Sequence, residues 1–362
     1  MIKTLLKNFS PENNITLWLI AAFLLAFIIA YRTFPTILYV AKEKHLMDEP
    51  DSRSMHTNTT PTLGGIGIFV GLIVVMTIVG AFLNTKVLLL VMGGLTILFF
   101  LGLKDDLTTL SAGKKFMGQL LVAGLLIVFT NTRIIGFSNI MDVDVLPYWI
   151  SIGFTLFVYV LIINAYNLID GVDGLAGTIA FCVSGVFVYL FVKSNELSLA
   201  TIAIALCGSL IAFLRLNFSN KNKIFMGDTG SMIVGFLLAF FTISFINIAQ
   251  VDKTSIYYKA SPALAFALLF YPLMDTLRIF VIRIIIHKTS PFKADRNHIH
   301  HRFIDNGYSH ITTTLLICSI NVIVISIAFN LLHLNLNTQI IFLLIYGSVL
   351  YMLPFLTKRV IK

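Results

Sequence analysis

The chain has 362 residues, of which 57% are hydrophobic and only 12% charged, and its mean hydropathy is +0.91. A water-soluble domain carries about 25% charged residues, so this composition excludes an ordinary soluble fold. The net charge of +9 does not require nucleic acid, because basic loops of a membrane protein set its topology and meet anionic headgroups.

Apolar stretches close to the roughly 20 residues needed to cross a bilayer as helix recur along the whole chain. Eleven are found, at 15–31, 63–82, 87–103, 117–130, 147–163, 174–192, 197–214, 229–249, 260–282, 311–332 and 338–357. The first could be a signal peptide, but its end lacks a small-x-small cleavage site, which favours a retained helix. The sequence predicts an all-α, polytopic membrane protein with a single domain over 1–362.

The basic residues are distributed unevenly between alternate loops. Of the 26 lysines and arginines, seventeen lie in loops on one side, seven on the other, and two in or beside the ninth span. The positive-inside bias makes the richer side cytoplasmic, with the N-terminus outside and the C-terminus inside. The cytoplasmic loops that carry polar motifs are then 32–62, 104–116, 164–173, 215–228 and 283–310.

Five unusual polar motifs all fall in these cytoplasmic loops. They are Asp48–His56 with Pro61–Gly65, Lys104–Asp106, Asn164–Gly174, Phe225–Ser231 and Asp295–Arg302. The orientation rests on hydropathy and basic residues alone, so the position of the polar motifs is an independent observation that agrees with it. It indicates that the five motifs form one shared site.

Five aspartates of these motifs stand close to the ends of apolar helices, where a carboxylate is costly unless it binds something. They are Asp105, Asp106, Asp170, Asp173 and Asp228. Each one alone is explained equally well as a helix cap or a solvated loop residue. Together they suit Mg²⁺, or alternatively Mn²⁺, which commonly completes its coordination shell with substrate phosphates. We therefore expect a phosphate-bearing substrate.

Three histidines, His298, His300 and His301, lie beside Arg296 and Arg302. A zinc site is one alternative, but no cysteine or HExxH helix is nearby. Solvated loop residues are another. Imidazole and guanidinium groups together are more typical of a site that holds phosphate or diphosphate oxygens.

Three motifs resemble those of the polyprenyl-phosphate N-acetylhexosamine-1-phosphate transferases, glycosyltransferase family 4. They are NLIDGVDGLA at 167–176, FMGDTG at 225–230 and DRNHIHH at 295–301. The last is similar to the histidine motif of the WecA/TagO-like branch, which uses UDP-N-acetylglucosamine. Muramoyl-pentapeptide transferases tend to have three consecutive histidines followed by an acid, whereas here Ile299 interrupts them and Arg302 follows. One departure is Ser54 after Arg53, where the family often has a basic residue.

The resemblance implies Mg²⁺-dependent transfer of N-acetylglucosamine-1-phosphate from UDP-N-acetylglucosamine to undecaprenyl phosphate in the inner membrane. UMP is released, and a lipid-linked glycan of the cell envelope is started, such as O-antigen, capsule or teichoic acid. The partners are these two substrates and the bilayer, without nucleic acid, and a homodimer is left open.

The resemblance also implies residue roles. The catalytic group comprises Asp105, Asp106, Asp170, Asp173 and His300. The metal ligands are Asp228 and Asp170. The substrate-binding group comprises Arg53, His56, Asn167, Asn217, Phe225, Arg296, His298 and His301, with Phe225 expected to stack on uracil.

Other functions account less well for these residues. A membrane transporter would place acids near the midplane, often in repeated or broken helices, whereas these acids stand at helix ends. A transferase that makes lipid I is the nearest enzymatic alternative. A CDP-alcohol phosphatidyltransferase is rejected, because Ala176-Gly177 replaces its Ala-Arg pair and no acid follows Asp173 until Glu196.

Overall fold

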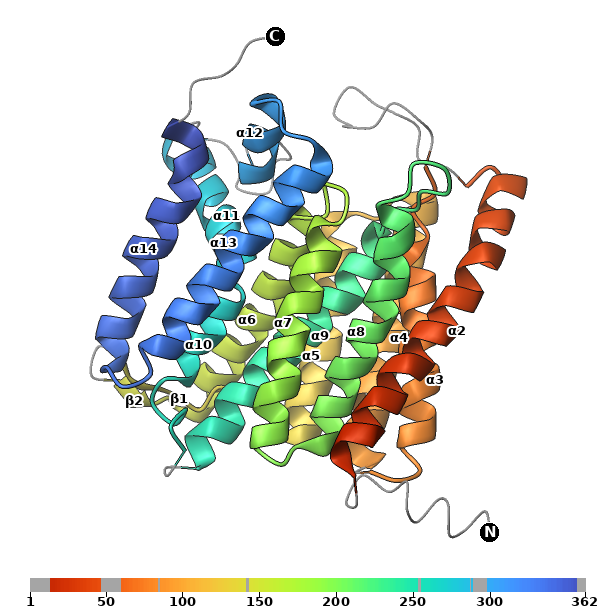
Figure 1. Cartoon of the computed structure of the whole chain (residues 1–362). Helices are drawn as coiled ribbons and strands as arrows, with labels where there is room; N and C mark the ends of the chain where they lie inside the picture. Colours follow the sequence, from red (N-terminus) through yellow and green to blue (C-terminus); the bar gives the residue numbers. More distant parts are fainter. Residues whose placement is uncertain are drawn as a thin grey trace.

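The computed structural model describes residues 14–46, 60–83, 85–140, 143–252, 255–286, 288 and 298–356. Within these ranges, nine long helices and the shorter α3 run side by side in one bundle (Figure 1). They are α2 (Ile15–Glu43), α3 (Gly64–Val79), α4 (Thr85–Thr108), α5 (Ala112–Thr130), α6 (Tyr148–Leu168), α7 (Leu175–Lys193), α8 (Leu197–Asn217), α9 (Gly227–Val251), α13 (His310–Asn330) and α14 (Leu336–Leu356).

Shorter elements complete the described chain. They are α10 (Ser261–Leu268), α11 (Phe270–Val281), the π-helical turn η1 (Ile282–Ile286), α12 (Ile299–Asp305) and strands β1 (Gly136–Ile140) and β2 (Val143–Val145). The strands pair antiparallel, at the opposite end of the bundle from α12 (Figure 1). We call these two ends the hairpin end and the α12 end.

The predicted all-α, polytopic architecture is confirmed. Among the described residues, nine helices are long and apolar enough to cross a membrane, and a bent pair of helices makes a tenth. The apolar helix α3, at 16 residues, is shorter than the others. Every predicted span coincides with helix, but eleven crossings remain a prediction. The hairpin and α12 fall in segments expected to be loops.

The predicted span 260–282 is broken, since α10 and α11 meet at Leu269 with a bend of 77°. Pro272 has no N–H to donate to the Leu268 carbonyl, so this carbonyl has no helical partner at the bend. The side chain of Asn321, from α13, closes both sides of the break. Its Nδ2 donates to the Leu268 carbonyl at 3.2 Å, and its Oδ1 accepts the Tyr271 N–H at 3.2 Å.

The centre of the bundle is α9. In its apolar 18-residue stretch, 89% of the residues are buried, against 22% in the corresponding stretch of α2. A helix that is apolar on all sides belongs inside other helices, and α9 lies behind α7 and α8 in Figure 1. Glycines let its first turn approach α3 and α4 closely. A Cβ at Gly65 would lie 2.2 Å from the Gly230 nitrogen, and one at Gly102 would lie 2.4 Å from the Thr229 Cα. The first turn of α9 is therefore fixed by backbone packing.

Replacing Asn321 with leucine is expected to lower the free energy of unfolding by about 1–3 kcal/mol, because a buried carbonyl and a buried N–H lose their partner. Thermal denaturation in detergent measures the effect. The control is Ser326→Ala on the same helix, where an exposed hydroxyl bonds only to the Val322 carbonyl of its own helix. Equal midpoints for the two variants would contradict this explanation of the break.

Candidate active site

A polar pocket of about 550 Å³ lies where the ends of several helices meet. It is lined by His45, Leu46, Thr62, Leu63, Asp105, Asp106, Leu107, Asn167, Asp170, Gly227 and Asp228. Four of the five predicted aspartates and Asn167 are in this lining. Four of the five predicted polar motifs are therefore brought together, as the sequence predicts.

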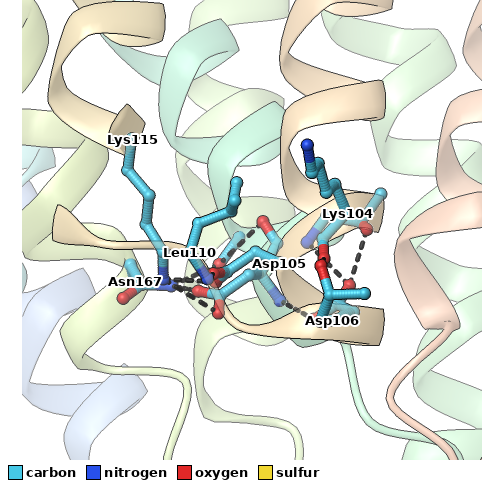
Figure 2. A network of polar contacts seen from close by, with 10 residues as sticks. Lys104, Asp105, Asp106, Leu110, Lys115 and Asn167 are labelled. Atoms are coloured by element: carbon cyan, nitrogen blue, oxygen red, sulfur yellow. Dashed lines mark hydrogen bonds and ion pairs between the residues drawn. The ribbon is translucent and has the colours of Figure 1, made fainter. Parts of the chain in front are cut away.

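Asp228, in the first turn of α9, is the centre of the polar network around the pocket. Its Oδ1 accepts a hydrogen bond from Asn167 Nδ2, and its Oδ2 lies 3.2 Å from Lys115 Nζ. Lys115 also forms an ion pair with Asp105, and Asn167 donates to Ser231 Oγ at 2.8 Å. Figure 2 shows the side chains of Lys115, Asn167 and Asp105 turned toward one another. One lysine thus bridges two carboxylates from α4 and α9.

Asp106 caps the start of α9. Its Oδ1 accepts the Asp228 N–H at 2.7 Å, and its Oδ2 accepts the Thr229 N–H at 3.0 Å and the Thr229 hydroxyl at 2.6 Å. The first N–H groups of a helix have no partner within the helix, and a carboxylate satisfies them well. Asp106 therefore positions Asp228 while also lining the pocket.

Asp170 follows α6 and faces the same pocket. Burial raises the pKa of its carboxyl well above the ordinary value, and the negative charges of Asp228, Asp106 and Asp173 raise it further. Several acids therefore crowd together with little compensating positive charge, which favours a bound cation.

Asp173 has different partners. Its Oδ2 lies 2.5 Å from Lys223 Nζ and 3.0 Å from His310 Nδ1. Burial alone would raise its pKa, but the hydrogen bonds from His310 and Lys223 outweigh burial and lower it. Asp173 is absent from the pocket lining, so its predicted catalytic role has no direct support in this geometry.

The histidines form a second cluster. The rings of His298 and His300 are stacked, with centroids 5.4 Å apart, and His301 lies 4.4 Å from His300. A Cβ added at Gly171 would lie 3.2 Å from His300 Nε2, so His300 abuts the loop that carries Asp170. Burial lowers the pKa of His300 to about 3, and its ring is therefore neutral at pH 7.

Asn217 and Phe225, both predicted to bind substrate, lie outside the pocket lining. Asn217 is buried, where its Oδ1 accepts the Gly174 N–H at 2.5 Å and its Nδ2 donates to the Ile224 carbonyl at 2.7 Å. It joins two loops of the site. The ring of Phe225 lies 5.4 Å from Lys223 Nζ. Arg53, His56 and Arg296 fall outside the described residues.

The donor chemistry of the pocket fits a hard divalent cation. In the described part of the chain, no three His, Cys, Asp or Glu side chains converge as a complete ligand set. Mg²⁺ does not need one, since it is commonly held by one or two carboxylates, waters and substrate phosphates. Asp228 and Asp170 are the carboxylates that would hold it.

Sequence reasoning missed Lys115 and Asp275 as site residues. The sequence identifies Lys115 only as one of the basic loop residues that set the orientation, and no sequence signal links it to the aspartates. Asp275 stands inside an apolar span, and an acid there is itself a sign of function or of a specific partner. The structure pairs its buried carboxylate with His298.

Comparisons with known proteins agree with these motifs. A family model described as glycosyl transferase family 4 matches residues 88–246. The chain is 30% identical to a probable undecaprenyl-phosphate N-acetylglucosaminyl 1-phosphate transferase of Bacillus subtilis, over 83% of this chain and 81% of that protein. It is also 30% identical to a decaprenyl-phosphate N-acetylglucosaminephosphotransferase of Mycobacterium leprae, over 81% and 79% of the two chains. An undecaprenyl-phosphate alpha-N-acetylglucosaminyl 1-phosphate transferase of Escherichia coli K12 is 29% identical over 75% and 72%.

Removing the helix cap is expected to destabilise the protein independently of any chemistry. Asp106→Ala leaves two N–H groups of α9 without an acceptor and should cost about 0.5–2 kcal/mol, whereas Asp106→Asn keeps one acceptor oxygen and most of the stability. Thermal denaturation in detergent compares the two. An alanine variant that melts with the wild type would show that the cap contributes nothing.

Proposed function

This chain belongs to glycosyl transferase family 4 as a glycosyl-1-phosphate transferase, and we propose that its donor is UDP-N-acetylglucosamine. The acceptor is a polyprenyl phosphate, with undecaprenyl phosphate as the expected lipid. The products are UMP and a polyprenyl diphosphate that carries N-acetylglucosamine, the first lipid-linked unit of an envelope glycan. The names of the relatives, which act on undecaprenyl and decaprenyl phosphates, support the acceptor class.

The observation that carries the proposal is the convergence of Asp105, Asp170 and Asp228 on one pocket with a single bridging lysine. Such an excess of carboxylates favours a divalent cation, and a cation held by two carboxylates has positions left for phosphate oxygens. The pocket stands at the ends of apolar helices, where a lipid phosphate meets a water-soluble nucleotide sugar.

In the reaction, an oxygen of the lipid phosphate attacks the β-phosphorus of the donor. The bond between that phosphorus and the oxygen bridging to the α-phosphate breaks, and the bridging oxygen leaves with UMP. A phosphate monoester is already largely ionised at pH 7, so its positioning matters more than removal of a proton. Bound Mg²⁺ would offset the negative charge on the diphosphate and the attacking oxygen.

The residues around the pocket have different roles in this reaction. Asn167 orients the Asp228 carboxylate, and Asp106 fixes the helix turn that carries it. Lys115 balances part of the charge of Asp105 and Asp228. Because the His300 ring is neutral, its expected contribution to donor binding is a hydrogen bond and not a charge. The muramoyl-pentapeptide donor is the second candidate, and the histidine motif with its interrupting Ile299 disfavours it.

The site is assigned to the cytoplasmic face of the bacterial inner membrane. The support is the excess of lysine and arginine in the loops at the α12 end, together with the cytoplasmic origin of nucleotide sugars. The same orientation keeps the hairpin end outside.

The direct test is turnover by the purified protein with undecaprenyl phosphate, Mg²⁺ and a panel of UDP-sugars. UMP release is expected with UDP-N-acetylglucosamine and should stop when EDTA removes the metal. Release that persists in EDTA would overturn the metal assignment, and no release with any donor would overturn the proposed reaction.

Asp228→Asn is expected to lower kcat by about a hundredfold or more without unfolding the protein, because the cation loses one carboxylate ligand. Asp252→Asn makes the same charge change at the other end of α9 and should keep normal turnover. UMP release over a Mg²⁺ titration compares the variants. Wild-type turnover by Asp228→Asn at low Mg²⁺ would remove Asp228 from the metal site.

Donor choice tests the histidine cluster. UDP-N-acetylglucosamine should be used far better than UDP-N-acetylmuramoyl-pentapeptide, and His300→Ala should alter the donor KM or kcat while the acceptor KM stays nearly unchanged. Competition between the two donors, with the acceptor varied separately, measures both. A His300→Ala defect confined to the acceptor KM would show that the cluster acts on the acceptor and not on the donor.

A further inference from the structure

We propose that Asp275 is a positioning residue that holds the proton of His298 on Nδ1 and fixes the start of α12. The inference deepens the proposed function, since it explains how the histidine cluster assigned to the donor is held in place. It is carried by hydrogen bonds between α11 and the segment that begins at His298.

Asp275 lies in α11 with its side chain fully buried. Its Oδ2 is 2.6 Å from His298 Nδ1, and its Oδ1 accepts the Ile299 N–H at 2.9 Å. The guanidinium of Arg278, one turn along α11, lies 3.7 Å from Oδ1. A buried carboxylate requires such partners, because its charge is costly away from water.

The Asp275 contact decides which ring nitrogen of His298 carries hydrogen. An ionised carboxylate only accepts hydrogen bonds, so Nδ1 must be the donor. Nε2, on the other side of the ring, is left for a different partner. The same relation fixes the orientation of histidines in metal sites. There, mutating the carboxylate that accepts from the ring lowers metal affinity or activity by about 10–100-fold.

His300 is held by a parallel contact. Tyr271 stands four residues before Asp275 and therefore on the same face of α11, and its hydroxyl lies 3.1 Å from His300 Nδ1. The stacked rings of His298 and His300 differ in plane by only 4°. Each ring thus has its Nδ1 turned to α11, and Nε2 of His300 faces Gly171, beside the acid pocket.

The break in the ninth span explains why α11 is available for this role. Asn321 fixes the first turn of α11 through the Tyr271 N–H, and the Ile299 bond anchors the first residue of α12 to the same helix. Asp275 therefore controls both the His298 ring and the helix that carries His300 and His301. A purely structural ion pair would couple Asp275 and His298 in the stability of the fold but not in kcat/KM for the donor.

The test is a double-mutant cycle on the full-length protein, with UMP release from UDP-N-acetylglucosamine as the readout. Asp275→Asn keeps the shape but can no longer accept at both oxygens, and it should lower kcat/KM for the donor by about tenfold with little change in the acceptor KM. The control is Thr276→Val on the next residue, which is buried with a hydroxyl that has no hydrogen-bond partner. It should behave as wild type.

In the His298→Ala background, Asp275→Asn should cost less than about twofold, because the ring that Asp275 orients is gone and the one oxygen kept by the variant can still accept the Ile299 N–H. A full, multiplicative loss in that background overturns the proposal, as does an Asp275→Asn variant indistinguishable from Thr276→Val. If the wild type itself gives no UMP, the proposed function fails and the cycle is replaced by the measurement below.

The proton position is measured without turnover and without an Asp275 variant. ¹⁵N spectra of the wild-type protein labelled at histidine, assigned by the signal lost in His298→Gln, should show a protonated Nδ1 for His298 at pH 7. An unprotonated Nδ1 would overturn the proposal, whether or not the enzyme reaction is the one proposed.

Discussion

The bonds from the Asp228 and Thr229 N–H groups to Asp106 connect the site to the centre of the protein. Because α9 is enclosed by other helices, its first turn cannot shift without moving the bundle, and Asp106 fixes that turn to the end of α4. The partial positive charge of a helix N-terminus also lowers the cost of two adjacent carboxylates. The acid pocket is thus a consequence of how the central helix begins.

A second constraint acts through the break between α10 and α11. Pro272 interrupts the helix, and Asn321 satisfies the freed carbonyl and N–H groups, so the interruption is stable inside an apolar bundle. The bend turns α11 so that Tyr271 and Asp275 reach the histidine cluster.

Sequence predicted much of this arrangement, because the apolar stretches fix where the helices lie along the chain. It also predicted that distant motifs meet at one end. It could not show which way a side chain faces within its loop, so Asp170 and Asp173, three residues apart, were grouped although they have different partners. Lys115 and Asp275 were missed because their contacts with Asp228 and His298 span 113 and 23 residues of sequence.

The two halves of the site meet at the loop that follows α6. Asn167, in the last turn of α6, donates to Asp228, Asp170 in the loop faces the pocket, and Gly171 lies against His300. At Gly171 a side chain would crowd the imidazole, so the absence of a Cβ lets the histidine cluster approach the acids. This loop therefore places the carboxylates of the pocket beside the imidazole rings of the histidine cluster. A neutral imidazole offers one hydrogen-bond donor and one acceptor, an arrangement that suits the proposed donor, with charge at its diphosphate and neutral hydroxyls on its sugar.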